Sequence, residues 1–379
     1  MTMGQTLSNS SSSGAPELTP GVLDVDPVLA IGQEPVDADA DLKDLLRWAS
    51  DLQQEQPMVL GYPEALDFRD HDLAPLLDVL VNNVGDPGSR DASGVSAKAH
   101  ELAVIQFMAA MAGTTVDEVY GYITTGGLEG IERGPELARE RLPHAAVYAS
   151  DQAHYGVRKA ARRLGMRVVS VPSRPDGSMD PDELRLRIAV RDYVPLGTRG
   201  ARRQTPPRRH PAGDLRHYLP RRLRRRGDPA SSCSAGGEVH VHVDAAMGGV
   251  IAAHAPSELS WSIADGADSL SMSGHKVIGA PVPCGVFLAR RDLVGGGEVG
   301  AEYVGATDRT WGCSRSGLAV LLLWRRLRAW GHQGLRQRVQ SCLDTAAYAA
   351  ETLATVPQAA VDRVPNTVKS SRQRDGCGV

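Results

Sequence analysis

The sequence predicts an α/β fold, in which a mostly parallel sheet is flanked by helices and followed by a small, truncated C-terminal domain. Three observations lead to this prediction. The chain has 379 residues, enough for one large domain and one smaller one. Apolar residues make up 42% and charged residues 23%, as in globular proteins. Strand-like and helix-like segments alternate along the middle of the chain, which favours a parallel sheet.

The first 90 residues are expected to form a tail and a helical segment. Residues 1–40 are rich in Ser, Pro, Gly and Asp, which is typical of a disordered tail. Within 41–90, apolar side chains recur at helical spacing between Asp41 and Gln54, and Leu73–Val81 also has a helical pattern.

Residues 91–290 are expected to form the large domain. A helix over Ala97–Gly113 would end at a glycine, as many helices do. The predicted strands beyond it are 116–122, 146–148, 167–171, 239–243 and 269–272, and the predicted helices are 137–141 and 155–164.

Two segments interrupt this alternation. Residues 191–233 are dominated by arginine and proline. A stretch translated in a shifted reading frame is the favoured interpretation, and a disordered basic loop is the second. A nucleic-acid-binding insert is the least favoured, because no aromatic residues or known module accompany the arginines. The C-terminal domain, 291–379, is expected to be partial because residues 369–379 have no periodic pattern.

Composition excludes several classes of function. A net charge of −3 gives no general attraction to nucleic acid or to anionic membranes. No apolar run approaches the roughly 18 residues that span a bilayer. The N-terminus lacks the pattern of a secretory signal, and the five cysteines have no paired spacing. A reducing, cytoplasmic location is therefore expected.

Lys276 is the leading candidate for a catalytic amine. The chain has only five lysines, and this one stands between the run Ser273–His275 and an apolar segment. A lysine becomes nucleophilic when it is removed from water or set beside another cation. The alternative is a lysine in an ordinary buried loop.

Asp244 is the second candidate, because it ends a predicted strand. Open parallel sheets bind ligands beyond the carboxyl ends of their strands. A Schiff-base lysine and an acidic partner for the pyridinium nitrogen are what a protein supplies to pyridoxal 5′-phosphate (PLP), so Lys276 and Asp244 together predict a PLP site. His240 and His242 alternate with Asp244 onto one strand face, which makes a metal site the alternative. That alternative is disfavoured because no second histidine pair follows.

Two further features suit a cofactor with a phosphate and an aromatic ring. The run Thr124–Gly130 is a glycine-rich turn between a strand and a helix, where backbone amides favour a phosphate, although such turns are also common without a ligand. His154 precedes a predicted helix, where its imidazole would stack on a cofactor ring or act only as a helix cap.

These residues resemble the group II PLP-dependent amino-acid decarboxylases, in particular the histidine decarboxylase branch with its serine and valine decarboxylase relatives. The resemblance covers roughly 55–190 and 238–355. The similar stretches are Gly61–Glu64, Asn82–Asp86, Gly121–Gly127, Tyr148–Tyr155, His242–Ala246 and Ser273–Gly285. The resemblance implies the aspartate-aminotransferase fold (fold type I) and a homodimer with its sites at the subunit interface.

The resemblance also implies a role for each candidate residue. It makes Lys276 the lysine that carries PLP, Asp244 the partner of the pyridinium nitrogen, and His154 the histidine stacked on the ring. The phosphate ligands that it implies are Thr125, Gly126, Gly127, Ser273 and His275. Tyr303 is implied as a proton donor.

The reaction implied is α-decarboxylation of an L-amino acid to the amine and CO2, with histidine favoured and serine or valine as alternatives. An aminotransferase, with Arg315 holding the substrate carboxylate, is a second hypothesis, because a fold does not determine a reaction. A catalytically impaired decarboxylase-like protein is the third. It follows from residues 191–233, where the Gly-Thr-Thr segment of the family has no counterpart.

Overall fold

The computed structural model describes residues 29–31, 33, 38–56, 65, 67, 69–89, 94–174, 177–193, 238–255, 260–295, 305, 307–356, 359–363 and 370–374. Most of the predicted tail, 1–40, and most of the arginine-rich segment, 191–233, lie outside these ranges, and the last three residues of the tail belong to a helix. The chain divides into two compact units, Met1–Leu60 and Gly61–Val379. In the first unit, helix α1 (Ala38–Glu55) contains the predicted helix. No helix among the described residues is long and apolar enough to cross a membrane.

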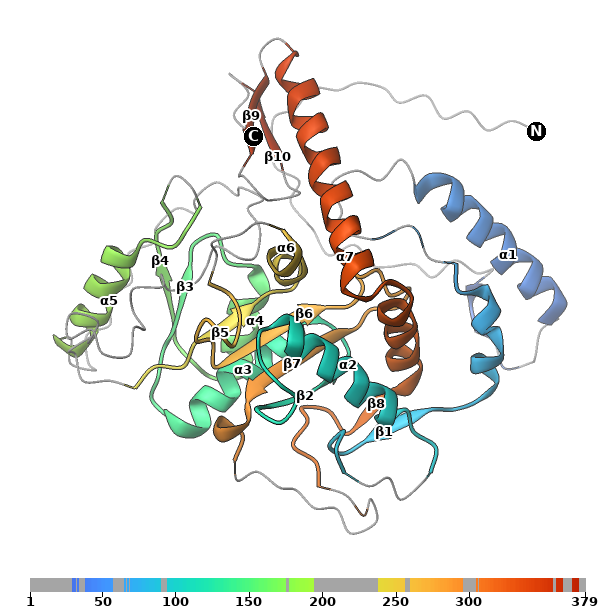
Figure 1. Ribbon diagram of the computed structural model, residues 1–379, viewed down its shortest axis with the longest axis horizontal. Coiled ribbons are helices and arrows are strands. Elements are labelled where there is room, and N and C mark those ends of the chain that lie inside the picture. The colour runs from blue at the N-terminus through green and yellow to red at the C-terminus, as the bar shows by residue number, and fades with distance from the viewer. Residues whose placement is uncertain are drawn as a thin grey trace. The chain divides into compact units, whose positions relative to one another are not determined.

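The second unit is built around a four-stranded sheet with the strand order β2-β7-β6-β5 (Figure 1). Its strands are β2 (Val119–Thr124), β7 (Gly285–Arg290), β6 (Ser269–Ser273) and β5 (His242–Asp244). β5 runs parallel to β6, whereas β7 is antiparallel to both β6 and β2. Three strands therefore share one direction, as predicted, and β7 is reversed. The sheet is mixed rather than mostly parallel.

Three smaller strand pairs and several helices complete this unit. The pairs are β3 (Val147–Ser150) with β4 (Val168–Val171), parallel, and β1 (Asn82–Val84) with β8 (Ser314–Ser316) and β9 (Ala359–Arg363) with β10 (Ser370–Arg374), both antiparallel. The helices are η3 (His71–Asp78), α2 (Lys98–Met111), α3 (Gly127–Arg141), α4 (Tyr155–Arg163), α5 (Pro181–Tyr193), α6 (Gly248–His254), η6 (Arg291–Leu293) and α7 (Gly317–Ala354).

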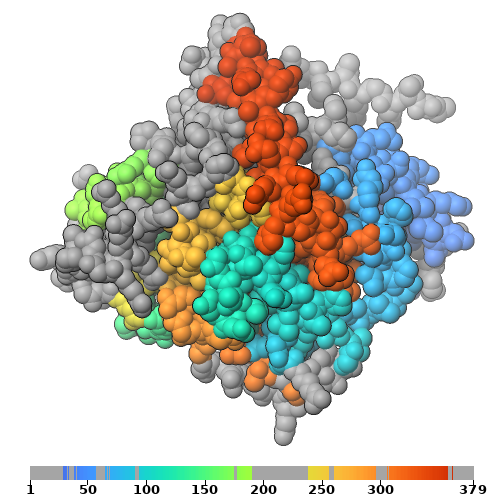
Figure 2. All heavy atoms as spheres, in the orientation of Figure 1, coloured from blue at the N-terminus to red at the C-terminus, as the bar shows by residue number. Residues whose placement is uncertain are grey.

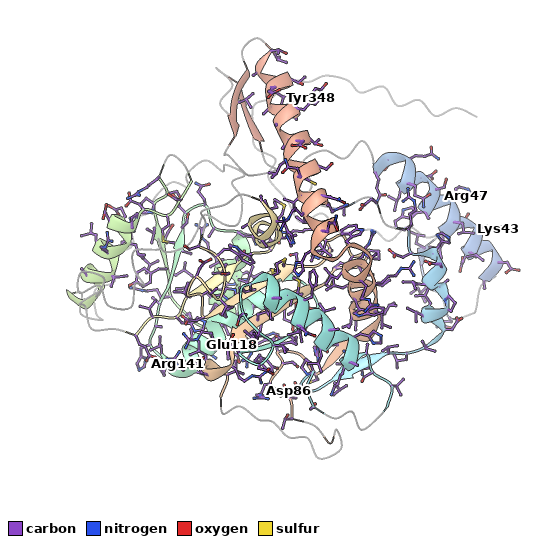
Figure 3. The ribbon with its side chains drawn as sticks, viewed as in Figure 1. Lys43, Arg47, Asp86, Glu118, Arg141 and Tyr348 are labelled. Carbon is purple, nitrogen blue, oxygen red and sulfur yellow. The ribbon has the colours of Figure 1, made fainter. Side chains whose placement is uncertain are left out.

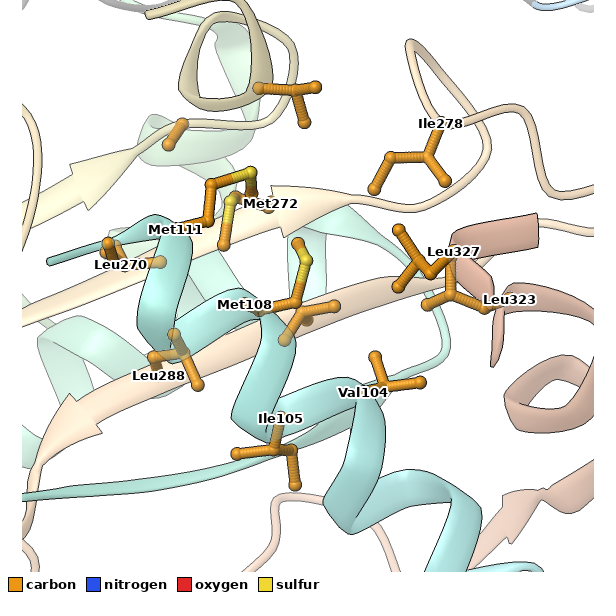
Figure 4. Close-up of a cluster of buried hydrophobic side chains, with 14 of the residues drawn as sticks. Val104, Ile105, Met108, Met111, Leu270, Met272, Ile278, Leu288, Leu323 and Leu327 are labelled. Carbon is orange, nitrogen blue, oxygen red and sulfur yellow. The ribbon is translucent and has the colours of Figure 1, made fainter. Parts of the chain in front are cut away.

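One face of the central sheet packs on α2 and α7 through apolar side chains. Leu270 and Met272 of β6 and Met108 of α2 are fully buried in this core (Figure 4). Leu323 and Leu327 of α7 belong to the same cluster. Figure 2 shows α2 and α7 side by side. Full burial of such a side chain stabilises the fold by about 1.5–3 kcal/mol, so this face supplies much of the hydrophobic stabilisation.

The opposite face carries α3, which approaches the sheet along a stripe of glycines. A Cβ atom added to Gly130 would lie 2.5 Å from the Cβ of Ser271, and one added to Gly134 would lie 2.1 Å from Nδ1 of His242. No larger residue fits at either position without movement. The spacing of three and four residues along Gly127, Gly130 and Gly134 puts all three glycines on one side of the helix.

Several element boundaries differ from the sequence-based expectations. Residues 71–78 form a 3₁₀ helix rather than an α-helix, and Pro75 inside it has no amide proton to donate. The strand predicted over 116–122 is β2, which begins at Val119 and continues to Thr124. The helix predicted over 137–141 begins ten positions earlier, at Gly127. The long helix α7 was not predicted.

Candidate active site

Three strands that run in the same direction end at one edge of the central sheet. β2 ends at Thr124, β6 at Ser273 and β5 at Asp244. Gly285, the first residue of β7, pairs with both Thr124 and Ser273. The fold thereby brings the glycine-rich turn and the Ser273–Lys276 run together, at the edge where open α/β sheets bind their ligands.

The glycine-rich turn leads directly into α3, whose first turn lies over the end of β6. A Cβ atom added to Gly127 would lie 3.0 Å from Oγ of Ser273. One added to Gly285 would lie 2.6 Å from Oγ1 of Thr124. The first amides of a helix have no intrahelical acceptor, and its N-terminus carries partial positive charge. This corner can therefore bind an anion such as a phosphate.

The side chain of Thr125 has another partner in this structure. Its hydroxyl and its amide donate to the same carboxylate oxygen of Glu129, Oε2, at 2.7 and 2.8 Å. Glu129 thus reaches back to the residues before α3, as the acidic residue of a capping box does. The hydroxyl of Thr125 therefore donates to a carboxylate, and the remaining candidate donors for an anion at this corner are the amides of Gly126 and Gly127 and the hydroxyl of Ser273.

Lys276 lies on the loop that joins β6 to β7. The amide of Gly274 donates to the carbonyl oxygen of Cys284 at 2.9 Å, and the amide of Ala280 donates to the carbonyl oxygen of Gly274 at 2.9 Å. Nδ1 of His275 lies 2.9 Å from the carbonyl oxygen of Cys284 and 3.3 Å from its amide. The loop is therefore closed on itself at its base. Lys276 lies near the tip of the loop and is partly buried.

Asp244 is only 8% exposed at the end of β5. Its Oδ1 accepts a hydrogen bond of 3.2 Å from the amide of Ala246. In the sheet it stands beside Ser271, and the amide of Ser273 donates to the carbonyl oxygen of Ala246 at 3.0 Å. These bonds join the Asp244 turn to the strand end that leads into the Lys276 loop.

The two histidines that precede Asp244 both contact the hydroxyl of Ser269. Nε2 of His240 lies 2.8 Å and Nδ1 of His242 lies 2.9 Å from Oγ of Ser269. Burial of the ring, followed by a smaller contribution from the charge of His240, lowers the pKa of His242 to about 3, so its imidazole is neutral. Within the described ranges, no three His, Cys, Asp or Glu side chains are grouped as metal ligands would be.

His154 caps α4. Its Nδ1 accepts a hydrogen bond of 3.1 Å from the amide of Gly156, and the side chain is exposed. A Cβ atom added to Gly156 would lie 2.8 Å from this nitrogen and 3.2 Å from Cδ1 of Leu128. The start of α4 therefore lies beside the start of α3. Capping does not exclude stacking of the imidazole on a ring, which stays a prediction.

Arg315 is buried in an ion pair with Glu101. The side chains of Arg315 and Glu101 are 2% and 0% exposed. The carboxylate accepts the amide of Ile123 at 2.7 Å, and the guanidinium donates to the carbonyl oxygen of Ile123 at 3.3 Å. The pair thus forms hydrogen bonds with the backbone amide and carbonyl of Ile123, on the edge of β2 just before the glycine-rich turn. Arg315 is not available to hold a substrate carboxylate, as the aminotransferase hypothesis required.

Asp86, labelled in Figure 3, anchors a second segment beside β2. It accepts hydrogen bonds from the hydroxyl of Tyr120 at 2.9 Å and from Nε of Arg309 at 2.7 Å. Burial, followed by the charge of Asp86, raises the pKa of Tyr120 far above its ordinary value, so the phenol stays protonated. Tyr303 lies outside the described residues, and its assignment as a proton donor stays a prediction.

The comparisons with known proteins agree with this geometry. The pyridoxal-dependent decarboxylase conserved domain matches residues 230–362. Histidine decarboxylase of Mesorhizobium japonicum is 34% identical over 316 residues, which cover 83% of this chain and 82% of the relative. Histidine decarboxylase of Pseudomonas entomophila is 33% identical over 302 residues, covering 78% and 71%.

Solved structures show the same fold. L-methionine decarboxylase from a Streptomyces species superposes with a TM-score of 0.74 at 21% identity, covering 93% of this chain and 88% of that one. Glutamate decarboxylase from Lactobacillus brevis superposes with a TM-score of 0.65 at 16% identity, covering 89% and 78%. The α/β structure is therefore that of the fold type I PLP decarboxylases.

The chain belongs to the group II PLP-dependent decarboxylase family. It is a PLP-dependent amino-acid decarboxylase, a carboxy-lyase, and the predictions of this family and of its cofactor are confirmed.

Proposed function

We propose that this protein decarboxylates L-histidine to histamine and CO2. The observation that carries the substrate is the identity of 34% over 316 residues with a histidine decarboxylase. Serine and valine are the alternatives, since specificity among amino acids depends on the side chains that line the substrate pocket.

The residues at the sheet edge fit PLP. A Cβ atom added to Gly127 at the start of α3 would lie only 3.0 Å from the Ser273 hydroxyl, so this hydroxyl lies close to the first backbone turn of the helix. The N-terminus of a helix favours an anion. Asp244 is a buried carboxylate at the end of the neighbouring strand pair. A phosphate cradle, an acidic group and a lysine amine are the donor set that this cofactor requires.

We assign each residue a role on this basis. Lys276 Nζ would hold the cofactor covalently, and Asp244 would keep the proton on its ring nitrogen. The amides of Gly126 and Gly127, with the hydroxyl of Ser273, would bind its phosphate. His275 and Thr125 are assigned to the phosphate by resemblance, although in this structure their side chains contact Cys284 and Glu129.

When bound, PLP supplies an electron sink for the bond between Cα and the carboxylate of the substrate. Asp244 would keep the ring nitrogen of the cofactor protonated. The other residues of the site would orient the substrate so that this bond breaks. A proton must then reach Cα, and Tyr303 is the proposed donor. His154 would orient the ring from the N-terminus of α4. No arginine is needed to retain the carboxylate, since it leaves as CO2.

The test is an assay of the purified full chain supplied with PLP. Amine and CO2 would be measured from L-histidine, L-serine, L-valine and L-methionine. We expect kcat/KM for histidine to exceed the others by roughly 100-fold or more, because a pocket that hydrogen-bonds a polar side chain rejects analogues that lack it. Preference for another amino acid would contradict the proposed substrate.

A second arm tests the site. Borohydride reduction fixes the cofactor on the lysine that holds it, and mass spectrometry locates that peptide. The label should lie on Lys276, and Lys276→Ala should abolish both label and product. Lys43→Ala, an exposed lysine on α1 (Figure 3), is the matched control and should retain both. A label at Lys276 without any product would favour the impaired-enzyme hypothesis.

The homodimer is also part of this proposal, because the resemblance puts the site at a subunit interface. Sedimentation equilibrium should give twice the chain mass of 40.4 kDa. A monomer that decarboxylates histidine would contradict it.

A further inference from the structure

We propose that Arg338 is a positioning residue, which holds the Lys276 loop (residues 273–285) in the shape that presents the lysine to its cofactor. The inference rests on the assignment of Lys276 made above. Arg338 lies on α7, 62 positions beyond the lysine, and nothing in the local sequence of the loop indicates it.

The contact is made at the residue that follows the lysine. Nε of Arg338 donates to the carbonyl oxygen of Val277 at 2.8 Å. Its two terminal nitrogens pair with the two carboxylate oxygens of Asp67, with Nη2 to Oδ1 at 3.0 Å. The guanidinium also lies over the ring of Trp330, 4.6 Å from the centroid. Three partners therefore determine the position of this one group.

The tip of the loop depends on this contact more than its base does. The base is closed by backbone hydrogen bonds among Gly274, Ala280 and Cys284. Beyond Val277, the side chain of Ile278 is fully buried. Gly279 has a φ of 77°, and a Cβ atom added there would lie 2.6 Å from the Cβ of Ala65. At the tip itself, the carbonyl oxygen of Val277 accepts a hydrogen bond from a side chain outside the loop, that of Arg338.

The chemistry of the contact requires an arginine. Partial burial tends to raise the pKa of Asp67, but the hydrogen bond and charge of Arg338 outweigh it and lower that pKa below its ordinary value. The carboxylate is thus charged when it orients the guanidinium. A planar fork can donate to a carboxylate through its end and to a carbonyl through Nε at the same time, whereas an ammonium group has no such fixed geometry.

The test measures the loop itself before it measures activity. Hydrogen exchange of the full-length apoprotein, followed by mass spectrometry, reports the opening of peptides that span 270–285. Arg338→Met should speed their exchange by roughly tenfold or more, because one charge-assisted hydrogen bond is lost. Arg336→Met is the matched control, since Arg336 is an exposed arginine on the same helix, and it should leave these peptides unchanged.

Two further variants separate positioning from general destabilisation. Asp67→Asn keeps Arg338 but removes the charge that orients it, so it should speed exchange of the same peptides by a smaller factor. If Arg338→Met does not fold, the exchange of Asp67→Asn still tests the inference. Arg338→Lys should restore part of the protection. With PLP supplied, Arg338→Met should lose the cofactor faster on dialysis, and kcat should fall more than KM changes.

The outcomes distinguish this inference from the proposed function. Unchanged exchange over 270–285 in both Arg338→Met and Asp67→Asn would overturn it, even if Lys276 carries the cofactor. Equal loosening across all peptides of the protein would also overturn it, because that pattern indicates global destabilisation. Absence of cofactor from Lys276 in the unmodified chain would instead contradict the proposed function.

Discussion

The two faces of the central sheet differ in role: one packs the apolar core, and the other carries the residues that we assign to the cofactor. The five residues of strand β6 contribute to both faces. Leu270 and Met272 point into the apolar core with α2 and α7. The alternate residues Ser271 and Ser273 point at the glycine stripe of α3. On the first face, large apolar side chains pack closely and exclude water. On the second face, glycines without side chains let the N-terminus of α3 approach the strand ends. The cofactor site that we propose lies where the second arrangement reaches the sheet edge.

The largest effect should come from the carboxylate on the polar face. Asp244→Asn should lower kcat by roughly 10²- to 10⁴-fold, the range for a group that holds a proton in place, while PLP stays bound. Steady-state assays and the absorbance of the bound cofactor measure the two properties separately.

Asp268→Asn is the matched control for this change. Asp268 is a buried carboxylate that stands just before β6, and its Oδ2 accepts the amide of Val241 at 2.7 Å. This variant should lose about 1–3 kcal/mol of unfolding free energy with kcat retained. Equal kcat losses in the two variants would contradict the assignment of Asp244.

Truncation of two neighbouring residues of β6 should destabilise the protein by different amounts. Leu270→Ala should cost about 2–5 kcal/mol of unfolding free energy, because it leaves a cavity in a core where the side chain is fully buried. Ser271→Ala should cost only about 1 kcal/mol, the value of one hydrogen bond, because its Oγ lies 3.4 Å from Nε2 of His242. Urea denaturation measures both. Similar costs would mean that the two faces do not differ as described.

The third test adds a side chain at a glycine where α3 lies close to the sheet. Gly134→Ala should destabilise the protein by about 1–3 kcal/mol, because the new methyl group would lie 2.1 Å from Nδ1 of His242. Gly312→Ala is the control, since an added Cβ there has no atom within 4 Å. It should be neutral or slightly stabilising. Thermal or urea unfolding of both variants decides the matter, and a stable Gly134→Ala protein would contradict the close approach.

The smallest effect is a pH dependence on the polar face. Burial lowers the pKa of His242 to about 3 in the folded state, against about 6.5 when unfolded. Between these values the unfolded chain binds one more proton, so stability falls as the pH falls. The expected loss is about 1 kcal/mol per pH unit between pH 7 and 5. In His242→Gln this contribution to the slope should vanish. Urea unfolding at both pH values measures it, and an unchanged slope would contradict it.

Much of the local structure could be predicted from the sequence, because short-range patterns determine it. Helix α2 ends at Met111, and Gly113, two residues further on, has a φ of 69°, so the glycine marks the end of the helix as predicted. The segment Gly285–Arg290 was missed as a strand because a short apolar run does not distinguish strand from helix. α7 was missed because Gly331, whose φ is 56°, interrupts its periodicity.

The sequence by itself determined the family, the cofactor and the order of the residues that we assign to it, because these depend on residue types within short stretches. Only the tertiary structure decided that Arg315 pairs with Glu101, 214 positions away, and that Arg338 grips Val277. It also decided which face of β6 meets the glycines of α3. A periodic pattern tells which residues share a face, but the element that covers this face is chosen by packing across the whole chain.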